Sequence, residues 1–426
     1  MYCGNCFRDN ALVSALRNLG HETLMVPLYL PMTLDEEDQS QGTPIFFGGV
    51  NVYLEQKSAL FRRMPHWLHN LLASPKVLKW AAGKAAKTRA EDVGELTLSM
   101  LRGEEGYQAR ELDNFITWLK DQPKPDLICL SNALLAGMVR KLRTELGIPV
   151  ICMLQGEDSF LDSLPEHIRG VVWQTLAERC AEVDHFIAPS RYFGDLMARR
   201  LSLPPERVSV AFNGINLEGY PIAQPTPSAE PPVLGYFARM CREKGLATLV
   251  DAFILLRRSG RVPNLKLRIG GGCGPSDEAF VEELRGKLSS NGLLGSVEFR
   301  PNVTRPEKLE FFKGLTVFSV PALYGEAFGL YVIEALAAGV PVVQPRTASF
   351  PELVEATGGG LLCEPGSATA LADSIESIVL DPVRARELGA RGRIAVQKTF
   401  SLDAMTRGVL QVYERVSNGS RVAAQV

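Results

Sequence analysis

The sequence has little net charge and no long apolar run. Its 426 residues carry 46 Lys and Arg against 48 Asp and Glu, for a net charge of −2. This balance argues against a whole-molecule electrostatic grip on nucleic acid. No run of about 18 uncharged apolar residues occurs, so we expect no membrane-spanning helix. The opening residues lack a basic segment followed by an apolar one, so no secretory signal is expected.

Cysteine is also sparse, with 8 residues in the whole chain. Most of them lie within apolar runs, where reduced cysteine acts as a small hydrophobe, and this predicts a reducing, cytoplasmic location. The exception is the CxxC pair Cys3 and Cys6, a spacing typical of redox centres and of half a zinc site. Because no second CxxC or histidine pair accompanies it, we predict neither a bound metal ion nor a redox cofactor.

The composition that remains is that of a globular protein, with 46% apolar and 22% charged residues. One hydrophobic core seldom extends past roughly 250–300 residues, so we expect two domains. Residues 221–232 contain five prolines, which fits neither a helix nor a central strand and predicts a stiff, extended linker. We therefore place one domain at 1–220 and the other at 233–400. A last helix within 401–419 can cross back to the first domain.

Short apolar runs alternate with amphipathic helices along most of the chain. Such runs, with helices between them, predict parallel sheets covered on both faces, and hence doubly wound α/β domains. The helices include 10–19 and 246–256. The predicted strands are 126–130, 148–154, 185–188, 265–269, 297–299, 317–320 and 340–343.

The first domain opens unusually. A doubly wound domain normally begins with a strand, then a glycine-rich turn, then a helix. Here the glycine-rich turn at Cys3, Gly4 and Asn5 comes at once, and the helix 10–19 follows it. We expect that the first strand is supplied from elsewhere or lies upstream of Met1 in a longer chain.

The densest motif is 321–343, PALYGEAFGLYVIEALAAGVPVV. A loop after a strand carries Glu326, and the helix that follows carries Glu334. The backbone N–H groups of Phe328, Gly329 and Leu330 are unpaired at the helix start, so they predict a site for phosphate or an anionic oxygen. A carboxylate beside such a site suits the hydroxyls of a sugar or ribose. Glu334 lies among apolar residues and therefore needs a partner.

A second motif, GYFARMCREKG at 235–245, places Arg239 and Lys244 in the loop between a strand and a helix. Ligands bind open α/β sheets at the carboxyl ends of their strands. Two cations at that position suit a diphosphate, because arginine can span two oxygens while lysine acts as a point charge.

Together these motifs resemble the retaining GT-B glycosyltransferases of family 4. The spacing from Glu326 to Glu334 matches the EX7E motif of that family, and Arg239 with Lys244 matches its Arg…Glu-Lys-Gly signature. The resemblance implies a GT-B fold, in which two Rossmann-like domains face a cleft, the first taking the acceptor and the second the sugar nucleotide. Further matches are Asn213-Gly214, at the end of the first domain, and the glycine-rich turn 270–272.

The resemblance also implies a role for each matched residue. Arg239 and Lys244 would neutralise the leaving nucleoside diphosphate, and Glu326 would contact the donor sugar, as the catalytic residues. The other donor-binding residues would be Glu334 at the ribose, the amides of Phe328, Gly329 and Leu330 at sugar and phosphate oxygens, Gly4 at the phosphates, Val303 at the base, and Gln155, Asn213 and Gly272 beside them.

The sequence departs from the family at two places. Gln155 stands where the family usually has histidine, and glutamine can hydrogen-bond a hydroxyl but cannot carry a proton. Ala348, Ser349 and Phe350 replace the usual Gly-Gly ahead of Pro351-Glu352, so donor identity does not carry over.

The activity implied is transfer of a sugar from a nucleotide sugar to an acceptor with retention of configuration, without a metal ion. Another GT-B enzyme, such as an epimerase or inverting transferase, would want a general base where Gln155 stands. A dinucleotide-dependent oxidoreductase is disfavoured because 270–274 lacks GxGxxG. A non-catalytic sugar-nucleotide-binding protein is the third alternative.

The segment 57–89 contains eight Lys and Arg, no acidic residue, and the aromatics Phe61, Trp67 and Trp80. One interpretation is a peripheral membrane contact at the inner face, or a patch for an anionic, lipid-linked acceptor; a polysaccharide is the other acceptor considered. The alternative is a helical insertion that packs its aromatics on the first domain.

Overall fold

The structure is a computed structural model that describes residues 4–28, 36–47, 56, 90–220 and 231–423. The basic segment 57–89 and most of the proline-rich segment 221–232 lie outside the described residues. The chain divides into two compact units, each treated below by itself. The C-terminal unit comprises Met1–Ala11, Ser190–Tyr192 and Phe212–Thr406, and the N-terminal unit comprises Leu12–Pro189, Phe193–Ala211 and Arg407–Val426.

The N-terminal unit contains a four-stranded parallel sheet in the order β1-β2-β3-β4. Its two central strands, VICM and HFIA, are buried on both faces, as expected for strands that are almost wholly apolar. The strands are β1 (Ile128–Leu130), β2 (Val150–Met153), β3 (His185–Ala188) and β4 (Val208–Val210).

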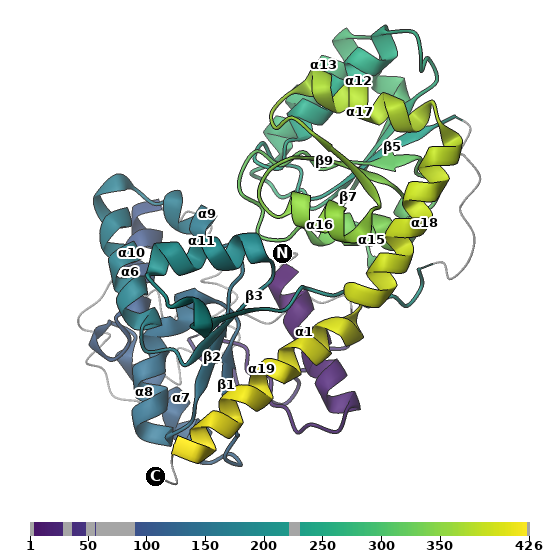
Figure 1. Ribbon diagram of the computed structural model, residues 1–426. Helices are drawn as coiled ribbons and strands as arrows, with labels where there is room; N and C mark the ends of the chain where they lie inside the picture. Colours follow the sequence, from purple (N-terminus) through teal and green to yellow (C-terminus); the bar gives the residue numbers. More distant parts are fainter. Residues whose placement is uncertain (1–3, 29–35, 48–55, 57–89, 221–230, 424–426) are drawn as a thin grey trace. The chain divides into compact units, whose positions relative to one another are not determined.

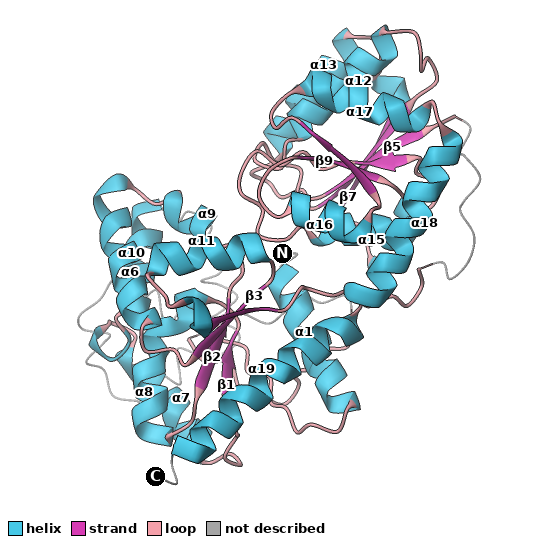
Figure 2. Ribbon diagram, viewed as in Figure 1, coloured by secondary structure: helices cyan, strands magenta, loops and turns pink. Residues whose placement is uncertain are grey.

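Helices connect these strands, as parallel pairing demands. Figure 2 shows the strands of the unit in the interior with helices outside. The helices within it are α6 (Ala90–Leu101), η2 (Gly103–Glu105), α7 (Ala109–Lys120), η3 (Ala133–Met138), α8 (Val139–Leu146), α9 (Glu157–Asp162), α10 (Glu166–Cys180) and η4 (Pro205–Arg207); α1 (Gly4–Asn18), α11 (Arg191–Leu201) and α19 (Leu402–Ala423) have residues in both units.

The C-terminal unit is built on a six-stranded parallel sheet in the order β10-β9-β8-β5-β6-β7. Figure 1 shows α12, α13 and α17 on one face of this sheet and α15, α16 and α18 on the other. The strands are β5 (Val233–Phe237), β6 (Lys266–Gly271), β7 (Val297–Pro301), β8 (Val317–Phe318), β9 (Val342–Pro345) and β10 (Gly360–Cys363). The helices are α12 (Leu246–Arg258), α13 (Glu278–Ser290), η5 (Leu294–Ser296), α14 (Arg305–Phe312), α15 (Leu330–Ala337), α16 (Phe350–Thr357), α17 (Ala368–Val379) and α18 (Pro382–Thr399).

The strand order reverses between β5 and β8. Strand β5 pairs with β6 on one side, where Gly235 lies opposite Arg268, and with β8 on the other, where Gly235 lies opposite Phe318. The crossover from β5 leads toward β7 and the crossover from β8 leads toward β10, so the connections diverge at this pair of strands. Such a switch point is where open α/β sheets bind ligands.

The core of the C-terminal unit lies between this sheet and its helices. In α12 the predicted apolar face is buried, since Leu246, Leu249, Val250 and Phe253 are all 0% exposed. The helix begins directly after Gly245, which has a φ of 71°. The apolar spacing that predicted this helix is therefore also what attaches it to the sheet.

The doubly wound α/β class predicted from the sequence is confirmed by both parallel sheets. Each predicted strand is present, with ends that differ by a few residues. One local prediction is wrong: Gly4 and Asn5, expected in a turn before the first helix, form the start of α1. Glycine and asparagine both favour helix N-termini, which explains the earlier start. No described helix is both long and apolar enough to cross a bilayer.

Replacing Phe253 should test the core directly. Because its ring is completely buried in α12, Phe253→Ala is expected to lower the free energy of unfolding by about 3–5 kcal/mol. Urea unfolding followed by circular dichroism would measure this loss. The matched control is Ile394→Ala in α18, where the side chain is 62% exposed and the expected change is within about 0.5 kcal/mol. Equal effects of the two substitutions would contradict this account of the core.

Candidate active site

The predicted site residues of the C-terminal unit lie at one edge of its sheet. Arg239 and Lys244 follow β5, Gly272 follows β6, Val303 follows β7 and Glu326 follows β8. Since all these strands are parallel, the loops after them emerge at the same edge. The strand-end positions inferred from the sequence thus converge on the switch point between β5 and β8.

The centre of the site is an ion pair across the switch point. Nζ of Lys244, from the loop after β5, donates to Oε2 of Glu326, from the loop after β8, at 2.5 Å. Their side chains retain only 19% and 13% of their exposure. Buried charges of this kind are retained only when they are paired, so each of these two residues requires the other.

Two tyrosines complete the cluster. The Tyr324 hydroxyl accepts a hydrogen bond from Lys244 and donates to Oε2 of Glu326 at 3.1 Å. The Tyr331 hydroxyl donates to the same oxygen at 2.7 Å. The Lys244 ammonium also lies over both rings, 4.9 Å from the centroid of Tyr324 and 5.3 Å from that of Tyr331.

These contacts set the charge states. Burial alone would raise the pKa of Glu326, but the Lys244 ammonium and the tyrosine hydroxyls hold it below its usual value. Burial alone would lower the pKa of Lys244, and the Glu326 carboxylate reverses this and raises it. The pair is therefore ionised at neutral pH.

Close backbone packing fixes the distance between the two loops. Gly245 follows Lys244 in the left-handed region, with a φ of 71°, and a Cβ added there would lie 1.8 Å from the carbonyl oxygen of Pro321. Only glycine fits this position. The loop after β5 thus rests directly on the backbone that leads to Glu326.

Arg239 is held by a carboxylate that the sequence interpretation missed. Its Nε donates to Oδ2 of Asp277 at 3.0 Å and its Nη2 to Oδ1 at 2.9 Å. Asp277 is buried, precedes α13 and also accepts the N–H of Gly274 at 3.1 Å. The hydrogen bonds from Arg239 lower the pKa of Asp277. Among the described residues nothing accepts a hydrogen bond from Nη1 of Arg239, and the side chain is 60% exposed.

Glu334 has the partner that its apolar surroundings demanded. Nζ of Lys308, in α14, donates to Oε1 of Glu334 at 2.9 Å. Helix α14 begins two residues after Val303, so this contact joins the loop after β7 to α15. Thr304 and Glu307 form a capping box that fixes the start of α14 and with it the position of Lys308.

The start of α15 has the predicted geometry. Gly329 is its N-cap, with a φ of 92°, and Leu330 is its first residue. Among the described residues, the N–H groups of Phe328, Gly329 and Leu330 donate to no backbone or side-chain acceptor. The carbonyl of Phe328 accepts the Ser349 hydroxyl at 2.8 Å, which anchors the loop after β9 against this helix start.

The loops after β6 and β7 are tied together. Oδ1 of Asn302 accepts the N–H of Cys273 at 2.9 Å, and its Nδ2 donates to the Cys273 carbonyl at 2.9 Å. Gly272, within this bridged turn, has open space where a side chain would stand. Val303, next to Asn302, is partly exposed. The turn thus presents backbone rather than side chains at the sheet edge.

Gln155 belongs to the N-terminal unit and follows β2. The buried Glu157 organises its loop by accepting the N–H of Gln155 at 2.8 Å, of Gly156 at 3.0 Å and of Ala133 at 2.8 Å. Burial raises the pKa of Glu157 against these amide donors. Nε2 of Gln155 and Oδ1 of Asp158 are buried and have no hydrogen-bond partner among the described residues. This loop therefore presents an unused donor and an unused acceptor.

The remaining predicted residues are Asn213 and Gly4. Asn213 is buried after β4 and groups with the C-terminal unit. The adjoining Gly214 is packed so closely that an added Cβ would lie 2.3 Å from the carbonyl oxygen of Ser401. Gly4 is the first residue of α1 and groups with the C-terminal unit as well.

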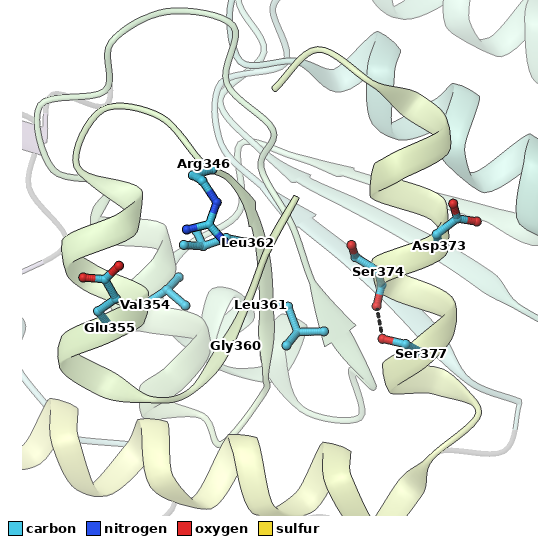
Figure 3. Close-up of a pocket in the computed structure, with 9 residues that line it drawn as sticks. All are labelled: Arg346, Val354, Glu355, Gly360, Leu361, Leu362, Asp373, Ser374 and Ser377. Carbon is cyan, nitrogen blue, oxygen red and sulfur yellow. Dashed lines mark hydrogen bonds between the residues drawn. The ribbon is translucent and has the colours of Figure 1, made fainter. Parts of the chain in front are cut away.

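A separate groove of about 540 Å³ lies at the outer edge of the six-stranded sheet (Figure 3). None of the residues predicted to bind the donor lines it, so it is distinct from the ion-pair site. It is lined by residues of the edge strand β10, of α16 and of α17 and by the residue after β9, namely Arg346, Val354, Glu355, Gly360, Leu361, Leu362, Asp373, Ser374 and Ser377.

The sequence interpretation missed the residues that hold the predicted ones. Asp277, Tyr324, Tyr331 and Lys308 all contact a predicted site residue. For Asp277 a signal was present, since an acid that ends a glycine-rich turn before a helix lies near other strand-end residues. Lys308 belongs to a different strand–helix connection from Glu334, and spacing along the chain gave no sign of the pair.

Two Rossmann-like parallel-sheet units, one with cations and carboxylates at its switch point, define the class of GT-B glycosyltransferases. The comparisons agree. The family model "Glycosyltransferase Family 4" matches residues 47–218, and the model "Glycosyl transferases group 1" matches residues 222–395. The chain therefore belongs to the family 4 glycosyltransferases with the GT-B fold.

Relatives and solved structures of this kind match large parts of the chain. The alpha-maltose-1-phosphate synthase of Mycolicibacterium smegmatis is 28% identical over 241 residues, which is 52% of this chain and 60% of that protein. The sucrose-phosphate synthase of Thermosynechococcus elongatus has a TM-score of 0.62 at 25% identity and covers 73% of this chain and 79% of its own. Anabaena Alr3699/HepE, in complex with UDP-glucose, has a TM-score of 0.61 at 17% identity over 92% of this chain and all of its own. The chain spans from 51% to 60% of the length of the first curated relatives it matches.

Removing one partner of the central pair should destabilise the protein. In Lys244→Met the Glu326 carboxylate is left buried without its cation, and the expected loss at pH 7 is about 3–5 kcal/mol in the free energy of unfolding. The double variant Lys244→Met/Glu326→Gln should recover most of it, because no charge is left unpaired. Urea unfolding of the three proteins measures both effects.

The pH dependence of that loss follows from the pKa of Glu326. Because the folded-state pKa is below its usual value, the pair contributes stability above the ordinary glutamate range and loses it as the pH falls through the lowered pKa. The difference between wild type and Lys244→Met should therefore shrink on acidification. A difference that stays constant as the pH falls from 7 to well below the ordinary glutamate range would contradict the pairing.

Proposed function

We propose that this chain transfers a sugar from a nucleoside diphosphate donor to an acceptor hydroxyl with retention of the anomeric configuration. The observation that carries the proposal is the meeting of Lys244 and Glu326 across the switch point, with Arg239 in the same loop as Lys244. It is supported by the family to which the chain belongs. The UDP-glucose bound to the Anabaena structure of similar fold makes a uridine nucleotide the first donor to test.

The donor diphosphate would be bound by cations and amides. Asp277 orients the guanidinium of Arg239, and Nη1 remains to donate to a phosphate oxygen. The ammonium group of Lys244 donates hydrogen bonds to Tyr324 and Glu326, and its third N–H remains for the ligand. The N–H groups at the start of α15 would receive a further anionic oxygen. We propose that these groups meet the leaving-group charge in place of a metal ion.

The ends of the donor would be distinguished by two carboxylates. Glu326, in the ion-pair cluster, would accept hydroxyls of the sugar, while Glu334, held by Lys308, would accept hydroxyls of the ribose. Val303 and the bridged turn at Gly272 would border the base through their backbone. The two acids, eight residues apart in the chain, would thus bind the sugar end and the nucleoside end of one ligand.

Retention would not require a protein base at Gln155. As the bond from the anomeric carbon to the β-phosphate breaks, negative charge develops on the phosphate oxygen, and Arg239 with Lys244 would stabilise it. That oxygen would take the proton of the acceptor hydroxyl, which forms the new bond to the same face of the sugar. Gln155 would hydrogen-bond a sugar hydroxyl instead of moving a proton.

The donor should be identifiable by turnover and by binding. We expect one member of a panel of UDP-, GDP- and ADP-sugars to release nucleoside diphosphate and to raise the melting temperature, with EDTA present throughout. NMR of the product in the presence of a competent acceptor would show the anomeric configuration, and an inverted anomer would refute retention. A folded protein that binds a donor without turning it over would favour the non-catalytic alternative.

Arg239→Ala should reduce kcat by 10²- to 10³-fold, because a preorganised group at the leaving charge typically contributes about 2.7–4 kcal/mol. The matched control is Arg242→Ala in the same loop. Its guanidinium is 62% exposed, pairs with Glu283 and lies over the ring of Phe280, so little change is expected. Steady-state kinetics would measure both variants, and an Arg239→Ala enzyme within about threefold of wild type would refute the assigned role.

A further inference from the structure

The hydrogen bonds to Glu326 are unevenly divided between its two oxygens. Oε2 accepts from Nζ of Lys244, from the hydroxyl of Tyr324 and from the hydroxyl of Tyr331. Oε1 accepts no hydrogen bond from a described residue, and it is not among the buried atoms without a partner. Oε2 thus receives all the hydrogen bonds that the described residues donate to this carboxylate.

The anchor contains a single cation, and the proposed function gives that cation a second task. When a diphosphate binds, Lys244 must direct its charge partly to the phosphates. Without compensation, this would leave Glu326 as a buried carboxylate with a weakened partner, and such a group tends to take up a proton or to move. The two tyrosine hydroxyls are the remaining donors to Oε2.

Tyr331 is better placed than Tyr324 to keep the carboxylate fixed. The Tyr324 hydroxyl is shared, since it accepts from Lys244 while it donates to Glu326. The only hydrogen bond of the Tyr331 hydroxyl within the described residues goes to Glu326. Its ring is buried in the first turn of α15, with centroid distances of 6.4 Å both to Phe318 in β8 and to Phe350 in α16. Elements on either side of the site therefore fix its position.

We propose that Tyr331 is a positioning residue of this site: its hydroxyl holds Oε2 of Glu326 while Lys244 turns to the donor diphosphate, so that Oε1 continues to face the donor sugar. The inference rests on the proposed function and extends it to a residue outside the motif residues Arg239, Lys244, Glu326 and Glu334. Its consequence is that Glu326 stays ionised and oriented throughout the reaction.

Among the described residues, four titratable side chains interact with Glu326. Lys244 faces it from the loop after β5, Tyr324 from its own loop, Tyr331 from α15 and Tyr236 from β5. Burial raises the pKa of Tyr331 well above its usual value, and the nearby Glu326 charge adds to this effect, so its hydroxyl remains a donor at every pH of interest. Loss of that donor should therefore raise the pKa of Glu326.

The test is Tyr331→Phe, which keeps the buried ring and removes only the hydroxyl. The acidic limb of kcat/KM should move to higher pH by about one to two units, because the carboxylate loses a hydrogen bond that stabilises its charged form. At pH 8 the variant should approach the wild-type kcat. Tyr413→Phe, in α19 and outside the site, is the control and should leave the profile unchanged.

A second measurement does not depend on turnover. In protein labelled with ¹³C at the glutamate Cδ, the resonance missing from Glu326→Gln identifies Glu326, and its titration should move to higher pH in Tyr331→Phe. An unmoved titration, or a kcat lowered equally at all pH values, would overturn the inference. If the resonance shifts but no donor is turned over by wild type, the contact stands and the proposed function fails instead.

Discussion

The ion pair between Lys244 and Glu326 is the constraint around which the C-terminal unit is organised. The two residues come from the loops after β5 and β8, which are adjacent parallel strands. The crossover after β5 leads to β6 on one side, and the crossover after β8 leads to β9 on the other. Neither charge is stable at this depth without the other, so the pair holds the two loops together at the separation that the Gly245 and Pro321 backbones set. Arg239 precedes Lys244 in the same loop, and α15 begins just after Glu326. The positions of both therefore follow from that separation.

Other buried or half-buried carboxylates also connect separate segments of the chain. Asp277 joins the loop after β6 to Arg239 in the loop after β5, and Glu334 joins α15 to α14 through Lys308. In the N-terminal unit, Glu157 gathers backbone amides from the loops after β1 and β2. Asp277 and Glu157 thus bridge two strand-to-helix connections each, while Glu334 bridges two helices.

The fold could be predicted from the sequence because its signals are local. The apolar runs at 148–154 and 185–188 mark buried strands, and the spacing of Leu246, Leu249 and Phe253 marks a helix face. The family, and the positions of Arg239, Lys244 and Glu326 at strand ends, could be predicted from the sequence for the same reason. The hydrogen-bond partners of these residues could not be predicted from the sequence. Arg239 meets Asp277, and Lys308 meets Glu334, only after separate crossovers have been wound onto one sheet. The roles of these residues toward a donor stay predictions.

The contact between Gly245 and the carbonyl of Pro321 limits how this site can be altered. The spacing of the two loops at this point is set by main chain touching main chain, so any side chain in place of Gly245 would force them apart. A change in the shape of the site that keeps these two loops in contact must therefore come from other positions.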